Sequence, residues 1–366
     1  MSCESAETPA GRTPGCVTAT ALPLVTVVMP VRNEAAFIRR GLTAVLGQDY
    51  PSDRLEILVV DGMSTDGTRA MVAELGHSHR QISLHLIDNP GMIVPIGMNI
   101  GLGRARGDII VRVDGHCVIA RDYVRRCVEH ITKDGVDGVG GSVTTVGGTR
   151  TSAAIAVAMS TRFGVGDSAF RTEQGKTGLV DTVPFPAYTR SIILKAGGYD
   201  EELARCQDDE YNYRLLDLGA RILLAGDVHS RYYGRGTLFS LWTQYFRYGY
   251  WKVRVLQKHP RQIRPRQSAP PLLAVFLILG LCLAVLFPWG WNSLAAIAGC
   301  YAAANLIAST AAAVREGWQH LPLLPLVYAT LHVSYGLGFL VGLGKFASRW
   351  GDKRGRVPLL DRPHTP

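Results

Sequence analysis

The sequence of 366 residues predicts an α/β domain with a mostly parallel sheet, followed by apolar helices that reach a membrane. Three observations lead to this prediction. Short β-branched runs alternate with helical segments up to about residue 146, the order that builds parallel sheets. Acidic residues follow two of those runs, Asp61 after 55–60 and Asp114 after 109–113. Beyond residue 271, long apolar segments replace the alternation.

The first strand is expected over Leu24–Met29, a largely β-branched run that Pro30 ends. Asn33 and Glu34 then cap a helix that runs to about Gly47. The other elements of this half are strands over 55–61, 82–87, 108–113 and 136–146, and helices over 68–75, 93–105 and 122–133. Because open α/β sheets bind ligands at the carboxyl ends of their strands, acidic residues at those ends indicate a binding site.

The alternation breaks down from residue 151 onward. A helix of small residues is expected over 153–159, and a glycine-containing mobile loop over 164–177. A further helix over 208–218 opens with three acidic residues. The stretch 239–257 then places aromatic and apolar residues at helical spacing beside basic ones, which is typical of an amphipathic helix at a membrane interface.

Three apolar segments follow, over 272–288, 293–314 and 322–347, and each approaches the length that spans a bilayer. Basic residues stand on both sides of them, in the linker 258–266 and in the tail 345–356. Basic flanks favour the cytoplasmic side of a membrane. Three complete crossings cannot put both flanks there, so the number of crossings stays open.

These patterns divide the chain into five parts, and the first lacks the apolar stretch of a signal peptide. The parts are a disordered lead-in (1–22), the α/β domain (23–235), the amphipathic helix with its basic linker (236–267), about three transmembrane segments (268–347) and a basic tail (348–366).

Composition narrows the class of protein. The formal net charge is +9, and the basic residues thicken beside the apolar segments, which favours a membrane surface over nucleic acid as the partner. The 7 cysteines are scattered and show no paired C-x-x-C spacing. This argues against a disulfide framework or a zinc site and fits a reducing compartment.

Six short motifs occur in a fixed order between about residues 24 and 260. They are VTVVMPVRNE (25–34), VDGMSTDGT (60–68), VDGH (113–116), GGYDE (197–201), Asp208-x-Glu210 with Arg214, and Gln244-x-x-Arg247-Tyr248. Together these resemble the inverting family-two glycosyltransferases with the GT-A fold. The resemblance is strongest to their membrane-attached exopolysaccharide branch, the succinoglycan-type glucosyltransferases. It implies a GT-A domain over 23–235.

The resemblance also implies which residues bind the nucleotide-sugar donor. They are Pro30, Glu34, Asp61, Asn99 and Asp114. Asp61 would accept a hydrogen bond from the base, but Gly62 stands where the family often has a second aspartate, so the base stays open. The residues alone allow other roles: Asp61 as a turn or capping residue, and Glu34 as a first-turn acid that the helix dipole favours.

The motif Asp114-Gly115-His116 stands where the family has Asp-x-Asp. The resemblance therefore implies that Asp114 and His116 hold a divalent metal ion, Mn²⁺ or Mg²⁺, that neutralises the diphosphate leaving group. Histidine suits manganese better than magnesium. The alternative is that His116 is only a polar residue at a strand end.

Inverting transfer needs one general base to take the proton of the acceptor hydroxyl. Alignment on Arg214 gives this role to Asp208, with Asp209 one residue out of register. The alternative is a capping cluster at a helix start. Glu210, Gln244 and Arg247 match the family's acceptor and donor mouth, although the last two also fit an ordinary amphipathic helix on lipid.

These expectations describe a metal-dependent inverting hexosyltransferase, multi-pass in the inner (plasma) membrane with its catalytic domain cytoplasmic. It would move a hexose from a nucleotide-sugar, a UDP-sugar, to a hydroxyl of a lipid-linked saccharide in extracellular polysaccharide or cell-envelope glycan synthesis. Other glycan-assembly enzymes are further expected partners. The alternatives are a glycolipid synthase with a simple lipid acceptor, a non-catalytic membrane scaffold of the same fold, and a nucleotidyltransferase. A nucleotidyltransferase would need a basic, glycine-rich phosphate-binding loop early in the chain, and residues 30–33 do not form one.

Overall fold

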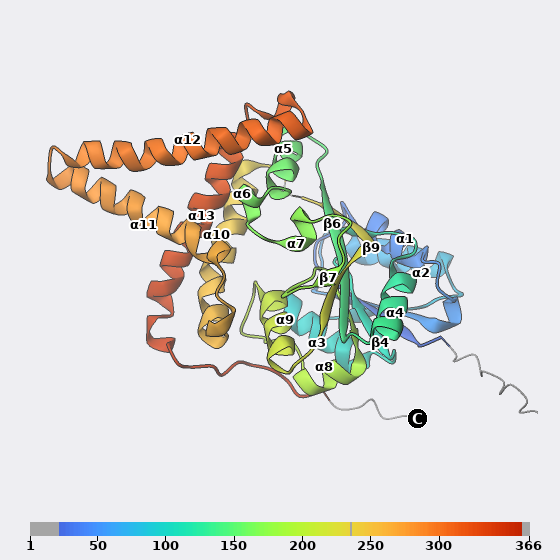
Figure 1. Ribbon diagram of the computed structural model, residues 1–366. Helices are drawn as coiled ribbons and strands as arrows, with labels where there is room; N and C mark the ends of the chain where they lie inside the picture. The colour runs from blue at the N-terminus through green and yellow to red at the C-terminus, as the bar shows by residue number, and fades with distance from the viewer. Residues whose placement is uncertain (1–21, 235, 361–366) are drawn as a thin grey trace, which may run out of the picture.

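Figure 1 shows the computed structural model, which describes residues 22–234 and 236–360. An α/β domain forms one side of the molecule, and four long helices stand against it, two of them projecting outward as a hairpin. The expected disordered lead-in (1–22) lies outside the described residues except for Leu22, and so do the last six residues of the expected tail.

One sheet of nine strands runs through the α/β domain in the order β3-β2-β1-β4-β8-β6-β9-β5, with β7 beside β9. The strands are β1 (Val25–Val31), β2 (Leu55–Asp61), β3 (Ser83–Asp88), β4 (Ile109–Arg112), β5 (Cys117–Ile119), β6 (Gly138–Val146), β7 (Gly178–Leu179), β8 (Ala187–Thr189) and β9 (Ile222–Tyr233). Strands β1 to β4 are parallel, as are β6 and β9, whereas β5, β7 and β8 pair antiparallel. The α/β class is confirmed, and the sheet is mixed, with more antiparallel pairing than the alternation predicts.

Helices cover both faces of this sheet. The helices of this domain are α1 (Ile38–Leu46), α2 (Thr68–Ser78), α3 (Val94–Arg104), α4 (Tyr123–Asp134), α5 (Arg150–Met159), α6 (Arg162–Val165), α7 (Ala169–Thr172), α8 (Arg190–Ala196) and α9 (Gln207–Asp217). Alternate residues of β1 serve the two faces: Val27 packs in the cluster with Leu42 of α1, and Val28 in the cluster with Met98 of α3. Both faces are therefore buried, as in a parallel sheet with helices on each side.

Two local predictions need correction. Pro30 does not end β1, which continues to Val31 with Pro30 opposite Val60. The pairing of β1 with β4 stops at Val28, so one side of β1 is open beyond it and tolerates a residue without an N–H. The stretch 164–177, expected as a loop, contains the end of α6 and all of α7.

The second half of the chain forms α10 (Leu238–Lys258), α11 (Pro265–Leu286), α12 (Gly290–Glu316) and α13 (Leu324–Lys345). Short 3-10 turns accompany the helices at Ser52–Arg54, Pro260–Gln262, Trp318–His320 and Ala347–Arg349. In the described residues three helices are long and apolar enough to cross a membrane: α11, α12 and α13. Helix α13 lies along α10, and α11 and α12 form the projecting hairpin (Figure 1).

Helix α10 keeps the amphipathic pattern that the sequence predicts, with Phe239 81% exposed at its start. Its last seven residues, 252–258, are buried within the protein. Contact of its exposed start with lipid stays a prediction.

The segment after α13, residues 346–360, turns back onto the α/β domain, and we call it the C-terminal strap (Figure 1). The Gly198 N–H donates to the Pro358 carbonyl at 2.8 Å, and the Glu201 N–H donates to the Arg356 carbonyl at 3.0 Å. Leu360 packs against the core cluster of α3, α8 and α9. The described part of the expected basic tail is therefore bound to the α/β domain.

Candidate active site

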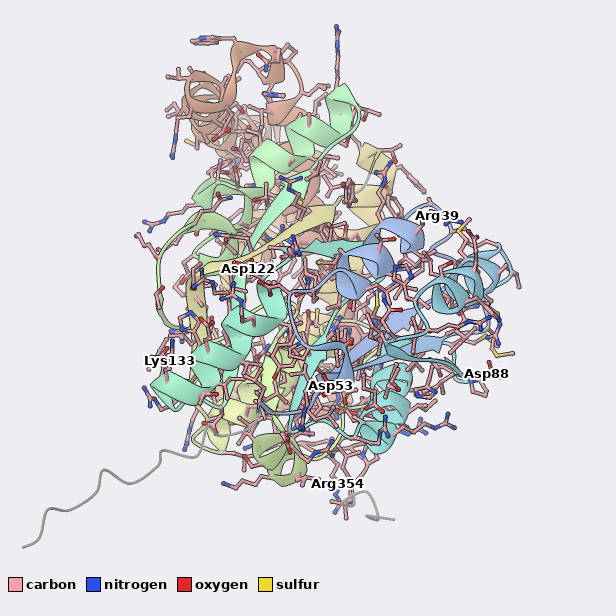
Figure 2. The ribbon with its side chains drawn as sticks, turned by 90° about the vertical axis from the view of Figure 1, so that its right-hand side faces the viewer. Arg39, Asp53, Asp88, Asp122, Lys133 and Arg354 are labelled. Carbon is pink, nitrogen blue, oxygen red and sulfur yellow. The ribbon has the colours of Figure 1, made fainter. Side chains whose placement is uncertain are left out.

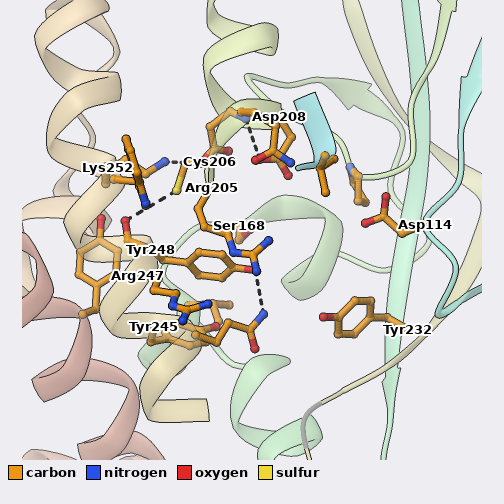
Figure 3. A pocket seen from close by; sticks show the side chains of 18 of the residues that line it. Asp114, Ser168, Arg205, Cys206, Asp208, Tyr232, Tyr245, Arg247, Tyr248 and Lys252 are labelled. Atoms are coloured by element: carbon orange, nitrogen blue, oxygen red, sulfur yellow. Dashed lines mark hydrogen bonds and ion pairs between the residues drawn. The ribbon is translucent and has the colours of Figure 1, made fainter. Parts of the chain in front are cut away.

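A cavity of about 1670 Å³ opens between the carboxyl ends of β1 and β4 and the helices α10 to α13. It gathers most of the site residues that the sequence predicts. These are Pro30, Glu34, Asp114, His116, Asp208, Gln244 and Arg247. Figure 3 shows Asp114 on one side and the aromatic and basic side chains of α10 on the other, with Asp208 between them at the top.

Asp114 leaves the end of β4 beside a buried cation. The Arg112 guanidinium donates from Nε to Asp114 Oδ1 at 3.0 Å and from a terminal nitrogen to Oδ2 at 3.3 Å. The two residues are two apart in an extended chain, so their side chains share a face. Burial opposes ionisation of Asp114, but Arg112, with smaller contributions from His116 and Arg205, outweighs burial and holds the pKa of this carboxyl below its usual value. Asp114 therefore faces the cavity as a carboxylate.

His116 is held by Glu34 across the end of the sheet. The His116 Nδ1 lies 2.9 Å from Glu34 Oε1, and its ring lies against Tyr232 with the centroids 4.9 Å apart. Glu34 comes from the loop between β1 and α1, where Asn33 has a φ of 52° and the helix begins only at Ile38. The predicted metal ligand and the predicted donor-binding acid are therefore direct neighbours.

Asp208 stands at the start of α9, which begins after Cys206 in the left-handed region at a φ of 59°. Its carboxylate is open to the cavity, while Asp209 turns to the ammonium of Lys252 on α10. Burial of the site and the neighbouring Asp209 charge raise the pKa of Asp208, against the opposing charges of Arg112 and Lys252. A carboxylate with a raised pKa is a better proton acceptor than an ordinary aspartate.

Glu210 does not line the cavity. It points back into the protein, where Arg214 donates to both of its oxygens at 3.0 and 2.9 Å and His259 Nε2 lies 3.3 Å from one of them. Burial opposes its ionisation, but His259 and Arg214 hold the pKa of Glu210 below its usual value. In this arrangement Glu210 anchors α9, and a role at the mouth of the site stays a prediction.

Asp61 and Asn99 also lie outside the cavity lining. Asp61 is fully buried and accepts from the Ser64 N–H at 2.9 Å and from Arg69 at 2.8 Å, so it fixes the turn after β2. Asn99 of α3 donates to the Tyr199 carbonyl at 2.9 Å and accepts from its N–H at 2.6 Å. In the structure Asp61 stabilises a turn, and Asn99 links α3 to the turn 197–201. Contact of either residue with a donor stays a prediction.

Gln244, Arg247 and Tyr248 line the cavity from one side of α10. The Gln244 amide donates to the Tyr248 hydroxyl at 2.8 Å, because residues four apart share a helix face. Figure 3 shows Arg247 beside Tyr245, below Tyr248. The helix thus presents a cation and hydrogen-bonding groups to the cavity.

Comparison with known proteins bears on this arrangement. Residues 26–195 match the family model described as glycosyl transferase family 2. The chain is 30% identical over 326 residues to the succinoglycan biosynthesis protein ExoA of Rhizobium meliloti (strain 1021), an alignment that covers 88% of this chain and 96% of that one. The chain belongs to glycosyltransferase family 2.

Two further relatives extend the comparison. A dolichyl N-acetyl-α-D-glucosaminyl phosphate 3-β-D-2,3-diacetamido-2,3-dideoxy-β-D-glucuronosyltransferase of Methanococcus voltae is 26% identical over 240 residues, 64% of this chain and 74% of that one. The mannosyltransferase PcManGT of Pyrobaculum calidifontis, solved with GDP-Man and Mn²⁺, superposes with a TM-score of 0.56 at 24% identity over 88% of each chain. The last likeness shows a shared fold. The protein is thus a GT-A-like glycosyltransferase with a nucleotide-sugar donor.

Several cavity residues of this glycosyltransferase escape a reading of its sequence. Arg112 lies inside a strand, where a single charged residue is usually taken for a surface position. Its spacing of two residues from Asp114 could have shown that the two side chains share a face. Lys252 meets Asp209 from 43 residues further along the chain, and only the fold brings them together. Arg171 reaches the cavity from the stretch 164–177, which the sequence predicts as a loop, and Arg162 reaches it from just before that stretch.

The apolar helices of the glycosyltransferase complete the cavity wall. Leu273 of α11, Tyr301 of α12 and Tyr335 of α13 line it together with Asp208. Helix α13 is tied to the α6 segment, since His332 Nε2 lies 2.8 Å from the Phe163 carbonyl. One cavity therefore extends from the polar end of the sheet to the apolar helices α11, α12 and α13.

Proposed function

We propose that the protein is an inverting, metal-dependent hexosyltransferase that moves a hexose from a UDP-sugar to a hydroxyl of a lipid-linked saccharide. The observation that carries this proposal is the shared cavity: Asp114 and Asp208 line it together with Leu273 and Tyr335 of the apolar helices. A site with polar and apolar ends fits a polar donor on one side and a lipid-borne acceptor on the other. The similarity to a succinoglycan biosynthesis protein supports a role in exopolysaccharide or cell-envelope glycan synthesis.

Asp208 is the proposed general base. The acceptor hydroxyl oxygen attacks the anomeric carbon and forms the new glycosidic bond, while the bond from that carbon to the diphosphate oxygen breaks. Both electrons of the broken bond leave with the diphosphate, and the hydroxyl proton moves to the Asp208 carboxylate. A single displacement inverts the anomeric configuration. The raised pKa and the open side of Asp208 support this role.

The donor end of the cavity fits a divalent metal ion. In residues 22–234 and 236–360 no three His, Cys, Asp or Glu side chains form a metal-binding group. Ions of the magnesium type take one or two carboxylates together with substrate phosphates, so the proposed site would depend on the donor for its remaining ligands. Asp114 would supply the carboxylate, and His116 a nitrogen. Metal-binding histidines commonly bond their other ring nitrogen to a carboxylate, the place that Glu34 occupies at 2.9 Å.

When bound, the ion would neutralise charge on the diphosphate leaving group. Arg112 beside Asp114 and Arg247 of α10, on the opposite wall of the cavity, would both add positive charge there. The two arginines bind and orient the phosphates, and their guanidinium groups suit phosphate oxygens geometrically.

We place the enzyme in the inner (plasma) membrane with its α/β domain on the cytoplasmic face, where nucleotide-sugars are made. Three helices apolar enough to span a bilayer support membrane attachment, and the basic flanks support the orientation. The acceptor would then approach along the apolar helices that line the cavity.

The test uses the purified full chain in detergent, incubated with Mn²⁺ and a panel of nucleotide-sugars. We expect release of the nucleoside diphosphate from one UDP-sugar, and transfer of labelled sugar into the organic phase when a membrane lipid extract is added. NMR of the product should show the opposite anomeric configuration to the donor. Asp208→Asn is the matched control. Transfer to diacylglycerol but not to lipid-linked saccharides would identify a glycolipid synthase. Absence of activity with every donor would contradict the proposed reaction and favour a non-catalytic membrane scaffold.

A further inference from the structure

We infer that the α11–α12 hairpin alone crosses the membrane, twice, and that α13 lies on the same side of the bilayer as the α/β domain. This inference concerns the membrane surface and goes beyond the proposed reaction. Length and apolarity make α11, α12 and α13 equal candidates for spans. Their contacts separate them.

Both ends of α13 are attached to the α/β domain or to α10. Near its start, the Tyr328 hydroxyl lies 2.9 Å from the Thr161 hydroxyl of the α5–α6 turn. Just after its end, the Phe346 carbonyl accepts from the Gln257 amide of α10 at 2.8 Å, in a buried position. A helix of 22 residues is about 33 Å long, enough to span a bilayer. A helix held to one domain at both ends cannot carry its far end across a membrane.

The full length of α13 packs against α10 at close range. A methyl group added at Gly338 would lie 2.0 Å from the Phe246 carbonyl oxygen, and one at Gly342 2.5 Å from that of Tyr250. In the other direction, a methyl group at Gly249 would lie 2.0 Å from the Tyr335 carbonyl oxygen. The two backbones therefore touch, and whatever side of the membrane α10 occupies, α13 shares it.

Charge places α10 outside the hydrocarbon layer. Its buried cations Lys252, Arg254 and Lys258 each pair with carboxylates of the α/β domain, such as Asp209 and Glu202. Lysine and arginine are costly inside a bilayer, and ion pairs that tie a helix to a water-exposed domain keep it at the surface. Helix α13, which packs on α10, lies there too.

The hairpin begins and ends at the body of the protein. At the start of α11, the Gln267 amide donates to the Tyr213 hydroxyl of α9 at 3.0 Å. At the end of α12, Ala312 and Ala313 are buried in one cluster with Ala154 of α5. The chain thus leaves the α/β domain once and returns to it once, which requires an even number of crossings.

The hairpin has the surface that a bilayer needs. Only 22% of the apolar window of α11 and of α12 is buried, against 39% for α13. The apolar window Gln267–Leu286 is about 30 Å long. Its first turns lie against α13, where a methyl group at Gly336 would lie 2.4 Å from the Pro270 carbonyl oxygen, so the hairpin enters the bilayer from a helix that itself lies at the membrane surface. Aromatic residues mark its tip, where Phe287 and Trp289 stack at 5.3 Å and Trp291 is 61% exposed, as at a membrane–water interface.

Two crossings also remove a conflict in the distribution of charge. Arg261 and Arg264 precede α11, whereas Lys353 and Arg354 follow α13. Three crossings would place these pairs on opposite sides. With α13 at the surface both pairs lie on one side, as the excess of basic residues in cytoplasmic segments predicts.

The test maps single cysteines in the full chain with a membrane-impermeant maleimide. The background replaces Cys3 and Cys16, which lie outside the described residues, and the exposed Cys282 and Cys300 by serine. Cys117, Cys127 and Cys206 stay because they are buried. Lys133→Cys reports on α4, Asn292→Cys on the hairpin tip and Arg354→Cys on the strap; Figure 2 shows Lys133 and Arg354 on the surface of the α/β side.

We expect intact spheroplasts to label Asn292→Cys alone, and inside-out vesicles to label Lys133→Cys and Arg354→Cys alone. Labelling of Arg354→Cys and Lys133→Cys from opposite sides would overturn the surface position of α13. An Asn292→Cys reporter that reacts from the α/β side, or from neither side, would overturn the crossing of the hairpin. Every variant is first assayed for sugar transfer, so that the labelled molecules are folded ones.

Discussion

Lys252 of α10 donates its ammonium to Asp209, the residue that follows Asp208 at the start of α9. The Lys252 side chain is 8% exposed. Burial opposes its charge, but Asp209 together with the smaller contributions of Tyr213, Cys206 and Tyr335 outweighs burial and holds the pKa of Lys252 well above its usual value. The helix that borders the apolar elements therefore holds the acidic start of α9 through this ion pair.

This ion pair makes a prediction about pH. Asp209 raises the pKa of Asp208, whereas Lys252 and Arg112 lower it. A base works when ionised, so activity rises as the pH rises through that pKa. Lys252→Met leaves the Asp209 charge uncompensated and should move the acidic limb of kcat/KM to higher pH. Lys252→Arg should restore the limb. Other ionisable groups near Asp208 are Tyr248 of α10, Tyr199 and Arg205, and none of them is changed in these variants. An unshifted limb in Lys252→Met would mean that Lys252 does not tune the base.

Removal of the proposed base should separate chemistry from binding. Asp208→Asn should reduce kcat by roughly two orders of magnitude or more, while the Kd for the UDP-sugar stays close to that of the wild type. Asp209→Asn, its matched control, keeps the carboxylate that faces the cavity and should retain far more turnover. A dead Asp209→Asn beside an active Asp208→Asn would move the base one residue along.

The metal proposal predicts a loss that can be reversed. Chelation should abolish sugar transfer, and Mn²⁺ should restore it at least as well as Mg²⁺, because one proposed ligand is an imidazole. Asp114→Asn and His116→Ala should weaken Mn²⁺-dependent UDP binding in calorimetry. Transfer at full rate in excess chelator would exclude the metal role of both residues.

The buried Arg254 predicts a stability difference. Its side chain is 0% exposed and pairs with Glu202 and Asp352, whereas Arg349, which pairs with the same two acids, is 37% exposed. Breaking a buried pair leaves an uncompensated charge, so Arg254→Met should cost about 3–5 kcal/mol. Arg349→Met should lower the Tm much less in detergent, and equal losses would mean that burial does not govern this cluster.

The same cluster sets a limit at acid pH. Burial would raise the pKa of Glu202, but hydrogen bonds from Arg254 and Lys258 lower it to about 2. A carboxyl with a depressed pKa contributes stability above its unfolded value, and that stability is lost as the pH falls toward about 2. Glu202→Gln should remove part of this dependence in pH-resolved unfolding of the full chain.

The α10–α13 contact predicts a contrast between two glycines of one helix. Gly338 has the Phe246 carbonyl oxygen 2.0 Å from the place of a Cβ, and Gly344 has nothing within 4 Å. Gly338→Ala must separate the helices and should cost about 1–3 kcal/mol, the range for overpacking. Gly344→Ala should be neutral or slightly stabilising, because alanine favours a helix. Thermal unfolding in detergent measures both, and equal Tm values would contradict the close packing.

Part of the fold follows from the sequence because local signals suffice. The strand 55–61 follows a turn and ends at Asp61, and β2 has those bounds. Strands β5, β7 and β8 are two or three residues long and carry no period, so their antiparallel pairing depends on tertiary contacts. The apolar windows locate α11 to α13, but hydropathy does not distinguish a helix in lipid from one packed on protein.

The site divides in the same way. Asp114, His116 and Asp208 stand at ends of regular elements, where a pattern of carboxylates can be seen, and the cavity joins all three. Asp61 and Glu210 show the same pattern, yet their side chains turn inward to Arg69 and Arg214. The direction of a side chain at the end of an element depends on partners from elsewhere in the chain. A linear motif therefore does not predict that direction.

The C-terminal strap ties the order of synthesis to the order of assembly. Leu360 packs against the core of the α/β domain, and Pro358 holds the backbone of Gly198. The ribosome makes these residues after the whole hairpin. A nascent chain can therefore complete the turn 197–202, which precedes the acidic start of α9, only after its hairpin has been translated. Until then the α/β domain lacks the contacts that the strap makes with Gly198, with Glu201 and with the edge of its core.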